Sequence, residues 1–234
     1  MEKSIEEYLR KGEEALNHGR PKLADNYLIK ALRLDPDSLT AHFYLALAKM
    51  KLGLLNEAEK HAKIVLMKNP VEPHANLNLG VIRKKRGDSR SAIRLYKKEI
   101  KLNPGSLQAY YNLGQMNCDR LRWKVALPYL LKCYRRGYHA DQLDQDVARA
   151  ARKSRNLRVE RELYRTELRK NPKDLWALNN LGATYIDTGN LKKARRLLLA
   201  ALKSLDSGSF QGRRTAWREM IKRNLGRTAA MKAA

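Results

Sequence analysis

The sequence has little of what marks exported, membrane-spanning or disulfide-bonded chains. Its two cysteines, Cys118 and Cys133, are too few for a disulfide framework or a zinc site, so we expect two packing residues in a reducing compartment. Its apolar runs, such as residues 197–202, are far shorter than the roughly 18 to 20 residues that cross a bilayer. The charged N-terminus lacks the apolar core of a secretory signal. We therefore expect a soluble, cytoplasmic protein, free or at the periphery of a membrane or protein assembly.

Motifs of catalysis and metal binding are also missing. The sequence contains no GxxxxGK[ST], GxGxxG, GxSxG, HExxH or CxxC pattern. Its five histidines do not pair at the spacing of metal ligands. The sequence therefore predicts no enzymatic activity, no cofactor and no metal site.

Acidic residues are scarce relative to basic ones. The chain has 24 Asp and Glu against 49 Lys and Arg, which gives a formal charge of +25. Its hydrophobic content of 43% is ordinary for a folded domain, so the charge does not indicate disorder. The surplus favours acidic partners, which include acidic proteins, nucleic acids and anionic lipids.

The most informative feature that is present is an internal repeat. Four prolines, Pro36, Pro70, Pro104 and Pro172, follow a 34-residue spacing, and Tyr138 stands at the vacant place. This register divides the chain into six repeats without insertions, at residues 5–38, 39–72, 73–106, 107–140, 141–174 and 175–208. The eighth position of every repeat holds a small residue, which lets two helices pack closely. These positions are Gly12, Ala46, Gly80, Gly114, Ala148 and Gly182.

Start and stop signals indicate two helices in each repeat. Glycine ends a helix at little cost, and it stands where the first helix should stop at Gly19, Gly53, Gly87 and Gly189. Three residues with side-chain oxygens stand two positions after a register proline, where they can cap the first helix of the next repeat. They are Ser38, Ser106 and Asp174.

These columns resemble the tetratricopeptide repeat family, and the resemblance covers residues 5–208. It implies an all-α fold, a right-handed α-solenoid of helix-turn-helix repeats whose first helices line a concave groove. The fourth and fifth repeats depart from the pattern. Leu121 and Arg155 replace turn glycines, Pro128 lies inside a second helix, and Glu160 stands where the family has a small residue. We therefore expect a local irregularity around residues 119–160.

Residues 209–234 follow the repeats and predict a basic amphipathic helix with a frayed end. Its apolar residues fall near one helical face: Phe210, Trp217, Met220, Ile221 and Leu225. A solenoid must cover its last apolar face, so the leading interpretation is a capping helix. The alternative is a helix that recognises a membrane surface or a protein partner.

The resemblance also implies which residues line the groove. The positions of the first helices that face away from the buried stripe are Phe43, Tyr44, Leu47, Leu77, Asn78, Val81, Tyr111, Asn112, Gln115, Trp176, Asn179 and Asn180. Asparagine recurs at the sixth position, where its amide could bind the backbone of an extended peptide or simply be solvated. The apolar members could anchor a partner or pack between neighbouring helices.

Two ordered columns of cations fall on the second helices. They predict a basic convex ridge formed by Arg90, Lys101, Lys124, Arg135, Arg158, Arg169, Lys192 and Lys203. Such a ridge is either a solvated face or a surface for an acidic protein, nucleic acid or anionic membrane. Aromatic residues that would stack on bases are scarce beside it, which disfavours nucleic acid.

The sequence therefore predicts a non-enzymatic scaffold or adaptor that holds a peptide or protein segment in the groove. The partner is expected to have an acidic surface, and self-association is compatible with the fold. The alternative is a basic helical-repeat protein that binds a polyanion, either RNA or an anionic membrane surface.

Overall fold

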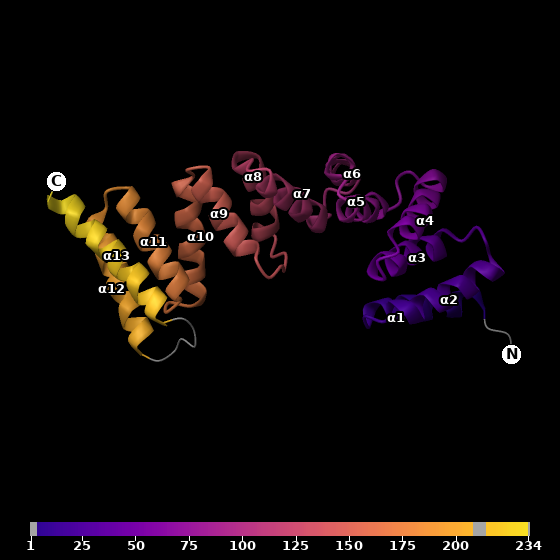
Figure 1. Ribbon diagram of the computed structural model, residues 1–234, viewed down its shortest axis with the longest axis horizontal. Coiled ribbons are helices and arrows are strands. Elements are labelled where there is room, and N and C mark those ends of the chain that lie inside the picture. The colour runs from indigo at the N-terminus through magenta and orange to yellow at the C-terminus, as the bar shows by residue number, and fades with distance from the viewer. Residues whose placement is uncertain (1–3, 208–213, 234) are drawn as a thin grey trace. The chain divides into compact units, whose positions relative to one another are not determined.

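The regular spacing of apolar residues and turn glycines produces a chain of short helices. The structure, a computed structural model, describes residues 4–207 and 214–233, and every regular element in these ranges is an α-helix (Figure 1). The predicted all-α helical-repeat fold is confirmed. The helices are α1 (Ile5–Asn17), α2 (Pro21–Leu34), α3 (Leu39–Lys51), α4 (Leu55–Lys68), α5 (Ala75–Lys85), α6 (Ser89–Leu102), α7 (Leu107–Asp119), α8 (Trp123–Arg135), α9 (Leu143–Lys153), α10 (Leu157–Lys170), α11 (Leu175–Asp187), α12 (Leu191–Asp206) and α13 (Arg214–Ala233).

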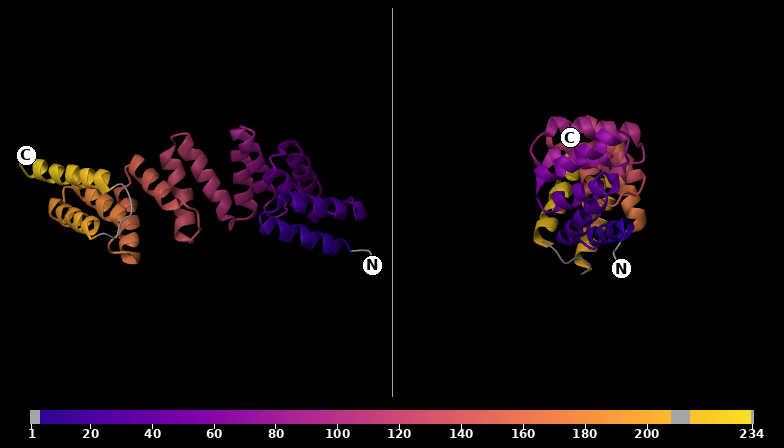
Figure 2. Two further views of the ribbon diagram at one scale, coloured as in Figure 1. Left: turned by 60° about the horizontal axis from the view of Figure 1, so that its bottom comes forward. Right: turned by 90° about the vertical axis from the view of Figure 1, so that its right-hand side faces the viewer.

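The helices form two compact units, which we call the N-terminal unit (residues 1–140) and the C-terminal unit (residues 141–234). The N-terminal unit holds α1 to α8, and the C-terminal unit holds α9 to α13. Within each unit, consecutive helices pair as hairpins, and the second helix of one pair contacts the first helix of the next (Figure 2). The boundary falls inside the stretch where the repeat pattern is weakest.

The turn between paired helices keeps one backbone conformation even where glycine is lost. Gly19, Gly53, Gly87 and Gly189 adopt φ values of 68°, 80°, 82° and 73°. Leu121 and Arg155 occupy the same repeat position with φ of 57°. The expected irregularity therefore takes the form of a strained backbone at a preserved turn, since a non-glycine residue in this conformation costs about 1 kcal/mol or more.

Pro128 does not interrupt its helix. Helix α8 runs from Trp123 to Arg135 with Pro128 inside it. The proline removes one backbone donor, and its exposed position allows the freed carbonyl to be solvated.

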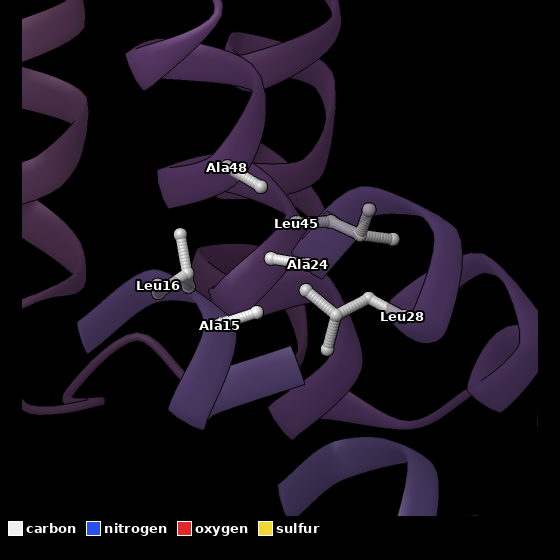
Figure 3. Packing of buried hydrophobic residues seen from close by; sticks show 6 residues of the cluster. All are labelled: Ala15, Leu16, Ala24, Leu28, Leu45 and Ala48. Atoms are coloured by element: carbon white, nitrogen blue, oxygen red, sulfur yellow. The ribbon is translucent and has the colours of Figure 1, made fainter. Parts of the chain in front are cut away.

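Close approach of paired helices explains the small eighth residue. A Cβ atom added to Gly80 would lie 2.6 Å from Cε1 of Tyr96, a ring that is completely buried between α5 and α6. Around the first two repeats, α1, α2 and α3 bring together one core cluster (Figure 3). Its buried members are Ala15, Leu16, Ala24, Leu28, Leu45 and Ala48.

Two of the three predicted side-chain caps form. The backbone N–H of Ala41 donates to Oγ of Ser38 at 3.3 Å, and that of Ala177 donates to Oδ1 of Asp174 at 2.6 Å. Ser106 precedes α7 but makes no side-chain cap bond, so its predicted role is wrong. Its hydroxyl is buried and has no hydrogen-bond partner among the residues that the structure describes.

Helix α13 packs against α11 and α12, the same two contacts that α3 makes with α1 and α2. Its buried residues are Ile221, with no exposed surface, and Thr228, with 6% exposed. Met220 is 44% exposed, Trp217 and Leu225 are half-buried, and Phe210 lies outside the described residues. The helix thus occupies the place of a further first helix, and its capping role stays a prediction.

Candidate binding surfaces

The predicted groove residues of the N-terminal unit lie on three first helices, α3, α5 and α7. We call Phe43, Tyr44, Leu47, Leu77, Asn78, Val81, Tyr111, Asn112 and Gln115 the first-helix surface. Leu77 and Asn78 are buried, with 4% and 8% of their surface exposed, and the other seven are half-buried. The surface therefore combines partly open side chains with members of the core.

Several members are held rigidly by core contacts. Leu77 belongs to a buried cluster with Tyr96 and Leu113, against which Val81 packs. Tyr44 and Leu47 pack on the cluster around Leu28 and Leu45. Core packing and partner anchoring are therefore not exclusive here, since one face of a side chain can support the core while the other stays open.

The aromatic members are arranged in pairs. The rings of Phe43 and Tyr44 meet edge to face at 5.6 Å. Burial and a hydrogen bond to Glu13 raise the pKa of Tyr44 to about 12, so its hydroxyl keeps its proton. Nε2 of Gln115 donates to the hydroxyl of Tyr111 at 2.8 Å. Ordered aromatic rings of this kind provide contact area at a low cost in side-chain entropy.

The asparagines at the sixth repeat position differ between the two units. In the N-terminal unit, Nδ2 of Asn78 and Nδ2 of Asn112 are buried and have no acceptor within residues 4–207 and 214–233. In the C-terminal unit, Nδ2 of Asn180 donates to the carbonyl of Trp176 at 2.7 Å. A buried donor without an acceptor costs about 1–3 kcal/mol, so Asn78 and Asn112 gain from any partner that supplies one.

The remaining predicted groove residues of the C-terminal unit contact other helices of that unit, Asn179 with α13 and Trp176 with α10. Asn179 is 1% exposed, accepts a hydrogen bond from Nδ2 of Asn224 at 3.0 Å and donates to Sδ of Met220 at 3.4 Å. Trp176 is half-buried, with its ring 5.0 Å from that of Tyr164. These residues form part of an internal interface of the C-terminal unit, and their predicted role in binding stays a prediction.

Sequence reasoning missed Asn76, which stands at the fourth repeat position. Its side chain has no exposed surface, and neither its amide nitrogen nor its amide oxygen has a hydrogen-bond partner among the residues whose structure is described. The family usually has a large apolar residue at this position, and that departure is the signal that could have found it. We find no physical reason in the structure for an amide at this place.

All eight residues of the predicted ridge are exposed and lie on second helices, as Arg90 and Lys101 on α6, Lys124 and Arg135 on α8, Arg158 and Arg169 on α10, and Lys192 and Lys203 on α12. The structure shows further cations beside those of the ridge on α10 and α12. An open hollow of about 740 Å³ on α10 is lined by Arg158, Arg161, Glu162, Arg165, Leu168 and Arg169. Another of about 540 Å³ on α12 is lined by Lys192, Lys193, Arg195, Arg196 and Leu199.

Glu160, which departs from the family pattern, has two hydrogen-bond partners on neighbouring helices. It is completely buried, accepts a hydrogen bond from Nε of Arg152 at 2.9 Å and another from the hydroxyl of Thr184 at 3.0 Å. A buried carboxylate needs such partners, and here they come from α9 and α11. The fifth repeat is therefore held by a polar network where other repeats use alanine.

Two histidines that are distant in sequence come together. Nδ1 of His42 on α3 lies 2.8 Å from Nδ1 of His61 on α4. Burial, with repulsion from His42 and Lys49, lowers the pKa of His61 to about 4. Across residues 4–207 and 214–233, no cluster of three or more metal-ligating side chains occurs, so the pair alone does not form a metal centre. None of the helices described here is long and apolar enough to span a bilayer.

The sequence matches family models of the tetratricopeptide repeat over residues 9–63, 77–138 and 163–196. The chain belongs to the tetratricopeptide repeat family. It is also 25% identical to human protein O-mannosyl-transferase TMTC3 over 179 residues, which are 74% of this chain and 19% of that protein. The chain thus spans about a fifth of the length of this relative.

Solved tetratricopeptide repeat structures share the fold. PilF of Pseudomonas aeruginosa has a TM-score of 0.64 and 21% identity, with 88% of this chain and 93% of that chain covered. YrrB has a TM-score of 0.62 and 18% identity, with 76% and 91% covered. MamA of Desulfovibrio magneticus RS-1 has a TM-score of 0.54 and 17% identity, with 74% and 97% covered. Proteins of this family commonly mediate protein–protein interactions.

Proposed function

We propose that this tetratricopeptide repeat protein is a non-catalytic scaffold that binds an extended peptide segment on the first-helix surface of its N-terminal unit. The buried amide donors of Asn78 and Asn112, which have no acceptor in the described part of the chain, carry the proposal. Peptide carbonyl groups are acceptors that every sequence offers. Two such donors on α5 and α7 favour recognition of a peptide backbone.

The surroundings of the two amides support the same partner. The rings of Phe43, Tyr44 and Tyr111 lie on the same set of first helices and are half-buried. Apolar side chains of a peptide can pack on such rings while its backbone bonds to the asparagines. The torsion about the Cβ–Cγ bond of asparagine is broad, so each amide can turn toward a bound chain.

The comparisons agree with this type of partner without identifying it. YrrB, which shares the fold, is described as a tetratricopeptide repeat protein with an unusual peptide-binding site. The match to TMTC3 covers 19% of that protein, and we propose that this chain does not carry the transferase activity in its name. We place the protein in the cytoplasm, in keeping with its sequence.

The test uses a peptide selected on the protein from a phage-displayed library of random linear peptides, then synthesised with a fluorescent label. We expect the Asn78→Ala, Asn112→Ala double variant to weaken its binding by about tenfold or more, since each hydrogen bond contributes about 1 kcal/mol. Tyr44→Ala with Tyr111→Ala should weaken binding further, because anchoring aromatics contribute about 2 kcal/mol or more when central. Anisotropy titrations give the dissociation constants, and circular dichroism verifies the fold.

The matched control is Asn180→Ala, which removes the asparagine of the same repeat position whose amide already has an acceptor. It should leave the affinity for the selected peptide within about twofold. Equal affinity of the native chain and the Asn78→Ala, Asn112→Ala variant would contradict the proposal. Unfolding of the Tyr44→Ala, Tyr111→Ala variant would show that those rings serve the core alone.

A further inference from the structure

The geometry points to a second binding surface, on α10 and α12 of the C-terminal unit, that fits an acidic peptide segment with apolar residues between its carboxylates. It is formed by the two hollows described above, which we call the arginine surface. Its residues belong to the C-terminal unit, so this inference is independent of the peptide site proposed on the first-helix surface. Of the four second helices that carry the predicted basic ridge, only α10 and α12 belong to this surface.

The hollow on α10 has cations in one line. Arg158, Arg161, Arg165 and Arg169 are separated by three or four residues, so they project from one side of the helix at steps of about 4.5 to 6 Å along its axis. The same hollow contains a single carboxylate, that of Glu162. Arginine offers a planar fork of donors that matches the two oxygens of a carboxylate.

The hollow on α12 has cations without any carboxylate. Lys192, Lys193, Arg195 and Arg196 line it together with Leu199, which is 43% exposed. Within the described ranges, neither Arg195 nor Arg196 has an acidic group within ion-pair distance, and the same is true of Arg158 and Arg161. These charges are therefore free to pair with a ligand.

Tyr185 of α11 joins the two hollows. Arg165 of α10 donates a hydrogen bond to its hydroxyl at 2.5 Å, and the ammonium group of Lys193 on α12 lies 5.7 Å from the centre of its ring. The ring is 6% exposed, so it acts as a buried support that brings one cation from each hollow to the same place. The two lines of cations thus form one surface.

The uncharged residues of this surface favour a peptide over a nucleic acid. Each hollow includes a leucine, Leu168 on α10 and Leu199 on α12, and apolar side chains of a peptide can cover these residues. Neither set of lining residues includes an aromatic ring on which a base could stack. A sugar-phosphate chain would use the arginines but leave the leucines in water.

The test measures binding of a labelled peptide built from Glu-Glu-Ala-Leu repeats to the full chain at low and at physiological salt. We expect the Arg161→Glu, Arg196→Glu variant to bind about tenfold more weakly, because charge reversal replaces two attractions by repulsions. Replacing each leucine of the peptide by serine should also weaken binding. An oligouridine of the same net charge should lose its binding at physiological salt, since phosphate contacts are strongly screened.

The control variant, Lys97→Glu with Lys98→Glu, changes the net charge equally at exposed positions of α6 that lie outside the predicted ridge. It should retain nearly all of the affinity for the acidic peptide. An equal loss in both variants would show only long-range attraction and would overturn the inference. Oligouridine or phosphatidylserine vesicles that bind more tightly than the peptide at physiological salt, and are lost in the Arg161→Glu, Arg196→Glu variant, would assign the surface to a nucleic acid or a membrane instead.

Discussion

The two compact units each bury a glutamate near the start of a second helix, and they neutralise it differently. Glu59 on α4 lies within 2.5 to 2.8 Å of three cations, those of Lys63, Arg83 and Arg86. Burial would raise the pKa of Glu59, but these cations hold it below its usual value. Glu160 on α10 has one cation, Arg152 at 2.9 Å, and the hydroxyl of Thr184.

Similar repeats therefore reach similar folds with different numbers of partners for their buried polar groups. The N-terminal unit has redundant partners for Glu59, yet it leaves the amide donors of Asn78 and Asn112 without an acceptor among the described residues. The C-terminal unit pairs its asparagines, Asn179 and Asn180, but relies on single contacts for Glu160. The unpaired amide donors of the N-terminal unit are compatible with a site at which a bound partner supplies the acceptors.

The largest expected effect comes from removing the residues after Ser207, which include α13. The C-terminal unit would lose the burial of Ile221 and the bond from Asn224 to Asn179, and we expect at least about 3 kcal/mol of destabilisation. Hydrogen exchange followed by mass spectrometry should show faster exchange in α11 and α12 and little change in α1 to α4. Unchanged protection of α11 and α12 would show that α13 is a recognition helix and not a cap.

Single substitutions of the glutamate partners test the comparison directly. Arg152→Ala leaves Glu160 buried with one hydroxyl partner and should cost about 2–3 kcal/mol. Arg86→Ala leaves Glu59 with Lys63 and Arg83 and should cost under about 1 kcal/mol. Urea denaturation of both variants gives the difference, and equal costs would remove the contrast between the units.

Mild acid should affect the N-terminal unit alone, because all five histidines precede residue 140. The folded pKa of His61, about 4, lies below its ordinary value of about 6.5, so the unfolded chain binds more protons between these values. Stability is therefore present above about pH 6.5 and is lost as the pH falls toward 4.

Since His61 is only half-buried, we expect a loss of about 1–2 kcal/mol at pH 5, measured by hydrogen exchange of α3 and α4. His61→Gln cannot titrate and should flatten the pH dependence of that unit. A loss of equal size in α10 to α12 would trace the effect to carboxylates and not to the histidine pair.

The smallest effect is expected at the two turns that lack glycine, one in each unit. Leu121→Gly and Arg155→Gly relieve a left-handed backbone and should each raise the free energy of unfolding by about 0.5–1 kcal/mol. Thermal denaturation should show a gain for both variants. A gain at only one turn would show that the other residue contributes packing that offsets its strain.

Much of the helical framework could be predicted because its signals are local. The 34-residue spacing placed turns at Gly19, Gly53, Gly87 and Gly189, and the structure has left-handed backbone at each of them. The side-chain cap of Ser106 was predicted wrongly, since the rotamer of a hydroxyl depends on the packing around it, which the spacing of residues does not specify.

The candidate sites could be predicted only in part. The sequence indicated the first-helix surface and the cation columns, but it did not indicate the pairing of His42 with His61, which are 19 residues apart. It also treated Glu160 as a defect of the fifth repeat, because the partner hydroxyl of Thr184 lies 24 residues further along the chain.

The sequence by itself determined the family, the helix pairs and the excess of positive charge, since each depends on composition or on spacing within one repeat. The tertiary structure alone decided which asparagines lack an acceptor and which arginines share a hollow. Asn112 and Asn180 occupy the same repeat position, yet only the amide of Asn180 donates to a carbonyl. Hydrogen bonds and burial depend on the orientation of each side chain among its packed neighbours, and that orientation does not repeat with the sequence.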